Sequence, residues 1–369
     1  MRFLSISRAS LAVFTLCALT GVGHADPHMS SGPLADQHAP AGVMFDHMHK
    51  AGEFMFGYRY AGTFASGSTQ HGSHTVTDDV IAEKGCVPHT CSMKASEMTM
   101  HMHMLDIMYA PTNWMTLMVM PMWMTHDMTM VPLRTTGHGH GGEHAEGHDM
   151  AGGHASGHGS HAGPHSHGVE GWGDTIFGPE LRLAHGPDYH LQFSPMFSAP
   201  TGRVDFKTAG VFTHYGMQLG SGTWDFWPSL TYTGRADRLA WGAQVLGIVR
   251  MEEENDSGYR LGDVLQVTGW VSYRFANWIS ASVRGLYTEQ GEIEGHYNGP
   301  HNHTSPPDLQ FNYGGRFWDI GFGVNTVVPS GPLKGLRLSA EWLQPMEDDP
   351  NGYQIERDGT LWANATISF

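Results

Sequence analysis

The chain has 369 residues and a formal net charge of −16, with 20 Lys and Arg against 36 Asp and Glu. This acidic balance argues against a nucleic-acid partner, because such a surface needs clustered basic side chains. Charged residues make up only 15% of the chain, whereas glycine (48 residues) and aromatic residues (11%) are abundant. This combination is typical of short strands in a membrane wall and argues against a soluble α/β enzyme.

The first 25 residues have the features of a bacterial signal peptide. Arg2 and Arg8 precede an apolar stretch. Small residues stand at the −3 and −1 positions of a cleavage site after Ala25. Beyond Ala25 no run of 18 apolar residues suggests a transmembrane helix. We therefore expect three parts: a signal peptide (1–25), a periplasmic N-terminal segment (26–51) and an outer-membrane barrel (52–369).

The C-terminal segment shows the pattern of a barrel strand most clearly. In residues 361–369 Leu, Ala, Ala, Ile and Phe alternate with Trp, Asn, Thr and Ser, and the chain ends on Phe369. A closed barrel is the only way for strands to pair every backbone group inside a membrane. The same period of two predicts an all-β, antiparallel transmembrane barrel. Its twelve strands are expected near 52–60, 98–110, 114–124, 172–184, 189–197, 222–234, 239–251, 264–276, 279–289, 313–328, 335–345 and 360–369.

The connections between these strands alternate in length. Short periplasmic turns are expected at 111–113, 185–188, 235–238, 277–278 and 329–334. Long extracellular loops are expected at 61–97, 125–171, 198–221, 252–263, 290–312 and 346–359. The strands follow from the residue pattern alone, so the alternation of connection lengths supports them independently. A soluble β-sandwich, the alternative, does not explain the export signal, the terminal Phe and the loop alternation together.

Two neighbouring strands carry a methionine at almost every second position. If Leu105 and Tyr109 face lipid, these methionines face the lumen. Thioethers are soft ligands that select Cu(I) or Ag(I). The alternative is packing, because Met fills irregular space, and a single bulge would reverse the parity. The candidate wall ligands are Met98, Met100, Met102 and Met104 on the first strand, and Met118, Met120, Met122 and Met124 on the second.

A histidine-rich tract occupies residues 137–168 of the longest predicted loop. It lacks apolar mass, so it does not form a core of its own. Neutral imidazoles bind Cu(II), Zn(II) or Ni(II), and their irregular spacing indicates several weak sites. The alternative is a solvated low-complexity loop with incidental affinity. The candidate ligands are His138, His140, His144, His148, His154, His158, His161, His165 and His167.

Other reactive residues have simpler interpretations. Cys86 and Cys91 favour a loop disulfide in an oxidising compartment over a thiolate metal site. Inward charges of both signs favour pairing across the lumen over a polar path. No nucleophile elbow and no phosphate-binding loop is present, so we expect no enzymatic activity and no required cofactor.

Three segments resemble a known family. They are AGVMFDHMHKAGEFMFGYRY (41–60), MHMLDIMYAPTNWMTL (102–117) and MQLGSGTWDFWPSLTYTGR (217–235). They are similar to outer-membrane barrels of the meta-pathway of phenol degradation family, whose members are commonly labelled transporters. The resemblance spans about 41–369 and implies uptake of aromatic solutes. The histidine tract looks like an addition to the family pattern.

Together these observations predict an outer-membrane channel or transport protein. The sharper hypothesis is that it binds or passes copper or silver ions through the His-rich loop and the Met wall, with Cu(I), Cu(II), Ag(I) or Zn(II) as cargo. One alternative is uptake of small apolar or aromatic solutes, supported by inward-pointing Trp227, Trp270 and Trp362. Another is a non-transporting barrel that displays the loop. The expected partners are outer-membrane lipid, the metal ion or small-molecule solute, and the barrel-insertion machinery during assembly.

Overall fold

The computed structural model describes residues 33–135 and 163–369. The expected signal peptide and most of the His-rich tract lie outside these residues. One antiparallel sheet closes on itself, because β1 (Phe54–His71) pairs with β19 (Gln354–Ser368) on one side and with β3 (Met93–Thr112) on the other. The prediction of a twelve-strand antiparallel barrel is confirmed.

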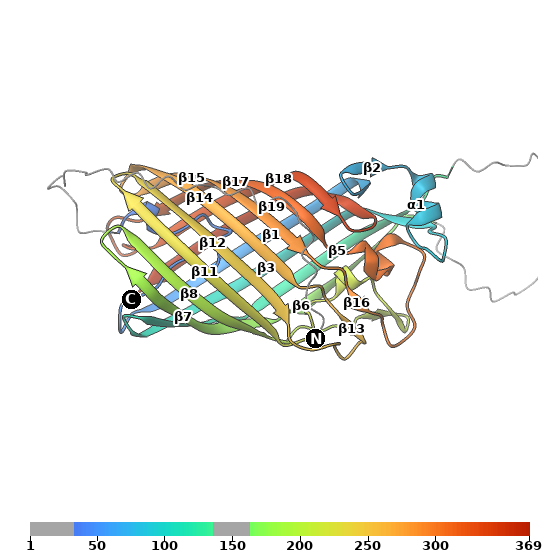
Figure 1. Cartoon of the computed structure of the whole chain (residues 1–369), viewed down its shortest axis with the longest axis horizontal. Helices are drawn as coiled ribbons and strands as arrows, with labels where there is room; N and C mark the ends of the chain where they lie inside the picture. Colours follow the sequence, from blue (N-terminus) through green and yellow to red (C-terminus); the bar gives the residue numbers. More distant parts are fainter. Residues whose placement is uncertain (1–32, 136–162) are drawn as a thin grey trace, which may run out of the picture. The chain divides into compact units, whose positions relative to one another are not determined.

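Two of the twelve wall strands are interrupted. β4 (Met115–Met120) and β5 (Met122–Pro132) both pair with β3 and are separated only by Pro121, which has no N–H to donate. β6 (His165–Trp172) and β7 (Thr175–His185) form the next wall strand. The remaining wall strands are β8 (Tyr189–Ala199), β11 (Asp225–Ala236), β12 (Leu239–Arg250), β14 (Val264–Ala276), β15 (Ile279–Gln290), β17 (Gly315–Val327) and β18 (Arg337–Pro350), all seen tilted in Figure 1.

Several strands are longer than predicted at their extracellular ends. The loop expected at 346–359 shrinks to residues 351–353, because β18 and β19 run almost to their junction. Similarly, the loop expected at 61–97 begins only after His71 and ends before Met93. A strand needs only about 10 residues to cross the bilayer. Beyond it both faces of a strand can be polar, so the alternation that marks a strand in the sequence fades.

The loops at the end of the barrel away from the C-terminus form a cap (Figure 1). The disulfide between Cys86 and Cys91 lies just after the α-helix α1. Among the described residues, no helix is long and apolar enough to cross a membrane. The elements of the cap are β2 (His74–Val76), α1 (Asp78–Lys84), β9 (Lys207–Thr208), β10 (Val211–Phe212), β13 (Tyr259–Arg260), β16 (Glu294–Gly295), and the 3-10 turns η2 (Tyr215–Met217), η3 (Pro306–Asp308) and η4 (Gln310–Asn312).

The two faces of the wall have opposite character. Outward side chains such as Leu105, Val245 and Val271 are exposed to the surroundings, at 48%, 47% and 54%. Inward ones such as Gln192 and Thr231 are buried. This alternation places an apolar belt against lipid and a polar surface against the interior, as a transmembrane barrel requires.

Residues 33–51, here called the inner segment, run through the barrel interior. The segment includes the 3-10 turn η1 (Ala35–Gln37). It starts at the periplasmic end, where the N–H of Ala35 donates to the carbonyl of Asn277. It also ends there, where the N–H of Ala51 donates to Asn113 Oδ1. Residues 33–51 of the segment that we expected in the periplasm thus enter the lumen and return.

Candidate functional site

The inner segment is held by side chains that point inward from many strands. Its backbone lacks a sheet partner, so its carbonyls need donors from the wall. The carbonyl of Phe45 accepts hydrogen bonds from Gln192 Nε2 (2.8 Å) and Thr231 Oγ1 (3.1 Å). The carbonyl of Met44 accepts one from Gln244 Nε2 (2.6 Å). Each of these donors is buried. The polar side chains that line the lumen therefore bind the chain's own backbone.

A buried ion pair of the wall also contacts the inner segment. Arg284 donates to both carboxylate oxygens of Glu341, at 2.8 and 3.0 Å, and both side chains are almost fully buried. Glu341 Oε2 also accepts the N–H of Gly42 (2.7 Å). A Cβ at position 42 would collide with both partners, so the segment can approach the pair only with a glycine there.

Other inward charges are also paired. Arg59 contacts Asp106 (3.4 Å) and donates to the carbonyls of Ala41 and Val43 (2.8 and 3.2 Å). Arg274 contacts Asp36 of the inner segment (3.3 Å). These residues are paired, which was the preferred interpretation of the sequence, whereas the inward carboxylate of Glu180 has no hydrogen-bond partner.

The predicted methionine wall faces the interior. Met104, Met108, Met118 and Met120 are 1–7% exposed and belong to one buried cluster together with Met55 and Met196. Met102 and Met122 are partly buried against the same cluster. Met124 is buried, and Met98 packs nearer the cap against Met128, Met130 and Met217. Met100 is partly buried and is not part of either cluster.

A small cavity, here called the thioether chamber, lies between this wall and the inner segment, with about 10 Å³ available to the centre of a water molecule. Met108, Met118 and Met120 line it. Glu180 of β7 also lines it and is 1% exposed, yet neither of its carboxylate oxygens has a hydrogen-bond partner. The lining holds three carboxylates (Asp46, Asp106 and Glu180) against the single guanidinium of Arg59, and it also includes His47, Met44 and Phe45.

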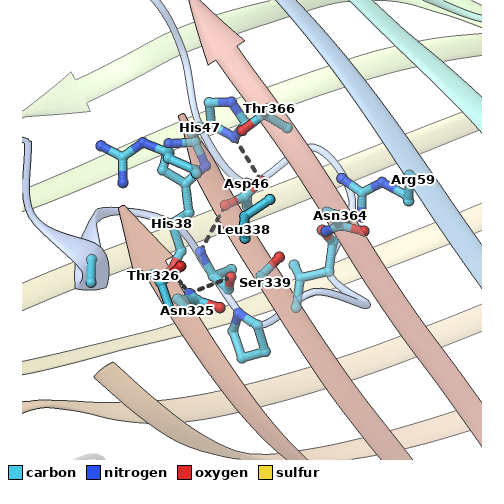
Figure 2. Close-up of a pocket in the computed structure, with 15 residues that line it drawn as sticks. His38, Asp46, His47, Arg59, Asn325, Thr326, Leu338, Ser339, Asn364 and Thr366 are labelled. Carbon is cyan, nitrogen blue, oxygen red and sulfur yellow. Dashed lines mark hydrogen bonds and ion pairs between the residues drawn. The ribbon is translucent and has the colours of Figure 1, made fainter. Parts of the chain in front are cut away.

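A second small cavity, with about 30 Å³ available to the centre of a water molecule, is here called the histidine pocket and shares Asp46, His47 and Arg59 with the first (Figure 2). His47 Nδ1 lies 2.8 Å from Asp46 Oδ1, and the other Asp46 oxygen accepts the N–H of Ala39 (2.8 Å). The His38 ring lies 4.0 Å from the His47 ring, centroid to centroid. Asn325 of β17 donates to the carbonyl of His38 (3.0 Å) and so fixes the backbone beneath that ring.

The described part of the His-rich tract reaches the cap. His165 and His167 lie on β6 with ring centroids 5.9 Å apart, and His167 lies 5.0 Å from His214. His214 Nδ1 is 2.7 Å from Asp308 Oδ1. Burial alone would raise the pKa of Asp308, but hydrogen bonds with His214 and Ser305 hold it below its usual value. The other predicted ligands of the tract, His138 to His161, lie outside the described residues.

The sequence did not indicate that a histidine pocket exists. None of its three residues, His38, Asp46 and His47, is among the ligands that the sequence suggested. The available signal was the run DHMHK (46–50), which places Asp46, His47 and His49 close together. This run does not indicate that the inner segment folds into the lumen, where His47 lies beside Met55 and His38.

The closed sheet, its apolar outer belt and its occupied polar lumen define an outer-membrane β-barrel of the channel class. The chain belongs to the family described as "Putative MetA-pathway of phenol degradation", whose model matches residues 139–341, more than half of the chain. The expectation that it is a channel or transporter of the bacterial outer membrane, rather than an enzyme, is confirmed at this level.

Two solved structures are similar to this chain, and the first of them shows the same fold. An outer membrane channel from Pseudomonas putida F1 is 13% identical, with a TM-score of 0.54 over 88% of this chain and 98% of that one. A FadL homologue from Pseudomonas aeruginosa is 9% identical, with a TM-score of 0.41 over 85% and 90%. No curated protein sequence matches this chain.

Proposed function

We propose that this channel binds and passes soft monovalent metal ions, Cu(I) or Ag(I), along its methionine wall. The observation that carries the proposal is the thioether chamber, where four Met side chains, one of them Met44 of the inner segment, share a cavity with the unpartnered carboxylate of Glu180. Thioether sulfur is a ligand type that selects Cu(I) over hard cations. A carboxylate buried without a partner is costly, and a bound cation would offset that cost.

The charge of the chamber supports the same cargo. Asp46, Asp106 and Glu180 exceed Arg59 by two negative charges when all are ionised. An apolar filler would leave this excess uncompensated, whereas a monovalent cation reduces it. Sulfur ligands continue from the chamber toward the cap through Met102 and Met122 to the cluster around Met128 and Met130. The wall therefore supplies soft donors along most of the barrel length.

Replacing Met108, Met118 and Met120 together with Leu tests this proposal. Leu keeps nearly the same volume, so the barrel should fold, but it removes three sulfur ligands. We expect Ag(I) to bind the purified barrel at least about tenfold more weakly, a loss of about 1.4 kcal/mol or more. The measurement is competition for Ag(I) against a soluble thioether. The matched control replaces the exposed Met251 and Met346, 57% and 66% exposed, with Leu. Equal affinity in both variants would rule out the chamber as the site.

Uptake of small aromatic solutes is the second candidate, and family membership favours it. Trp227 and Trp362 pack against the methionine cluster, and Trp270 is buried against Ala39 and Val43. Sulfur–aromatic contacts are favourable, so the same wall suits an aromatic ring. Liposome uptake of phenol that is unaffected by metal chelators would favour this candidate. If neither phenol nor Ag(I) crosses, the barrel only displays its His-rich loop.

A further inference from the structure

We propose that the inner segment carries a Cu(II) site made of His38, Asp46 and His47. It lies in the histidine pocket, which shares Asp46, His47 and Arg59 with the thioether chamber, and it does not depend on what the channel transports. One ligand atom from each of the three residues lies within 4.8 Å of the other two. Ligands that share one ion at about 2.0–2.2 Å are at most about 4.4 Å apart, so small side-chain movements complete the geometry.

The two ring nitrogens of His47 each face a hydrogen-bond acceptor. Nδ1 lies 2.8 Å from Asp46 Oδ1, and Nε2 lies 3.4 Å from Met55 Sδ. Carboxylate oxygen and thioether sulfur are both acceptors, and a neutral imidazole has only one N–H. When the ring is neutral, one of these two contacts therefore brings two lone pairs together with no hydrogen between them.

An ion bound to Nδ1 resolves this conflict. The ring proton then lies on Nε2 and is donated to Met55 Sδ, while Nδ1 and Asp46 Oδ1 both face the ion. With bonds of about 2.0 and 2.1 Å, donors 2.8 Å apart subtend about 86° at the metal. That is close to the right angle between neighbouring ligands in a tetragonal Cu(II) site, which favours nitrogen and oxygen ligands.

The surroundings hold the ligands in place and leave room for an ion. Asp46 Oδ2 is fixed by the N–H of Ala39, so Oδ1 is the oxygen left for the metal. The His47 side chain remains 15% exposed beside the pocket. The same pocket is lined by Arg337 and by Arg59, which is labelled in Figure 2. Arg59 is engaged by Asp106, and Arg337 donates to the carbonyl of Leu34 (2.9 Å) and to Gln37 Oε1 (2.6 Å).

These guanidinium groups also determine which cations the pocket accepts. Ca²⁺ and Mg²⁺ depend on several negatively charged oxygens, and the pocket offers one carboxylate beside two arginines. Imidazole nitrogen binds Cu(II) strongly without needing a formal charge. We therefore expect Cu(II) to bind while Ca²⁺ and Mg²⁺ do not compete.

The test is the amount of Cu(II) that the full mature chain retains against a glycine competitor, read by electron paramagnetic resonance. The His38→Ala/His47→Ala variant should lose one tightly held equivalent, with at least about tenfold weaker binding of the first ion. The control, His101→Ala/His103→Ala, removes two histidines whose nitrogens contact Tyr60 and Tyr58 in the barrel wall and should retain the equivalent. Equal retention in both variants would overturn the proposal, because the His-rich loop would then hold all the copper.

Asp46→Asn keeps the test valid if the double variant does not fold. Its amide oxygen can still accept the N–H of Ala39, so the segment should stay in place while the anionic ligand is lost. We expect at least about tenfold weaker Cu(II) binding, and unchanged binding would also overturn the proposal. Competition by Mg²⁺ would contradict the Cu(II) assignment. The Met108/Met118/Met120 Leu variant should retain this Cu(II) even if it loses Ag(I), which separates the two sites.

Discussion

A chain that lacks residues 33–50 is expected to form a more conductive pore than the complete protein. In the complete protein, this part of the inner segment is hydrogen-bonded to inward side chains of β1, β8, β11, β12, β17, β18 and β19 and occupies the space between them. Barrels larger than about eight strands have more lumen than their own side chains fill. Removing the segment should therefore leave a water-filled path, with conductance in a planar bilayer higher by on the order of tenfold.

A gentler variant controls for loss of folding. Gln192→Ala, Gln244→Ala and Asn364→Ala together remove one donor each to the carbonyls of Phe45, Met44 and Ala41. The wall backbone is untouched, so we expect a folded barrel with frequent, brief openings. If both variants conduct no more than the complete protein, another part of the chain closes the pore, and the cap would be the first place to look.

Breaking the Arg284–Glu341 pair should cause the largest loss of stability of any single substitution discussed here. Arg284→Met leaves the Glu341 carboxylate buried without its partner. Removing one member of a buried pair typically costs about 3–5 kcal/mol, because the remaining charge is uncompensated. Glu341 would still accept the N–H of Gly42, which places the expected loss toward the lower end of that range. The measurement is the unfolding temperature of the barrel in detergent, read from its heat-modifiable migration on a gel.

Two comparisons make this result specific. Arg316→Met breaks the Arg316–Asp349 pair, whose side chains are 59% and 39% exposed, and should cost at most about 1 kcal/mol. The double change Arg284→Met/Glu341→Leu removes both buried charges and should recover much of the loss. If the single Arg284→Met variant unfolds at the same temperature as the Arg316→Met variant, water must reach the Arg284–Glu341 pair.

The two proposed metal sites differ in the hardness of their ligands. The histidine pocket offers nitrogen and oxygen, whereas the thioether chamber offers sulfur, and His47 lines both cavities. Each site therefore has its own probe, Cu(II) for the first and Ag(I) for the second. The separate variants show which of them, if either, binds metal.

The sequence by itself determined the wall of this protein. Residue alternation requires only local information, since successive side chains on a strand point to opposite faces. All twelve strands, the five short turns and the inward parity of the methionines followed from it. Loop boundaries were less accurate, because strands such as β18 and β19 continue beyond the bilayer, where the alternation is lost.

Only the tertiary structure decided what the barrel contains. Residues 33–51 have neither a strand period nor a helix period, and their conformation is set by donors up to 323 positions away, as for Asn364 and Ala41. Contacts of that separation leave no pattern in the local sequence. For the same reason the histidine pocket was not predicted. His38 and His47 are nine positions apart, and it is the fold of the segment inside the lumen that brings them together beside Asp46 and Met55.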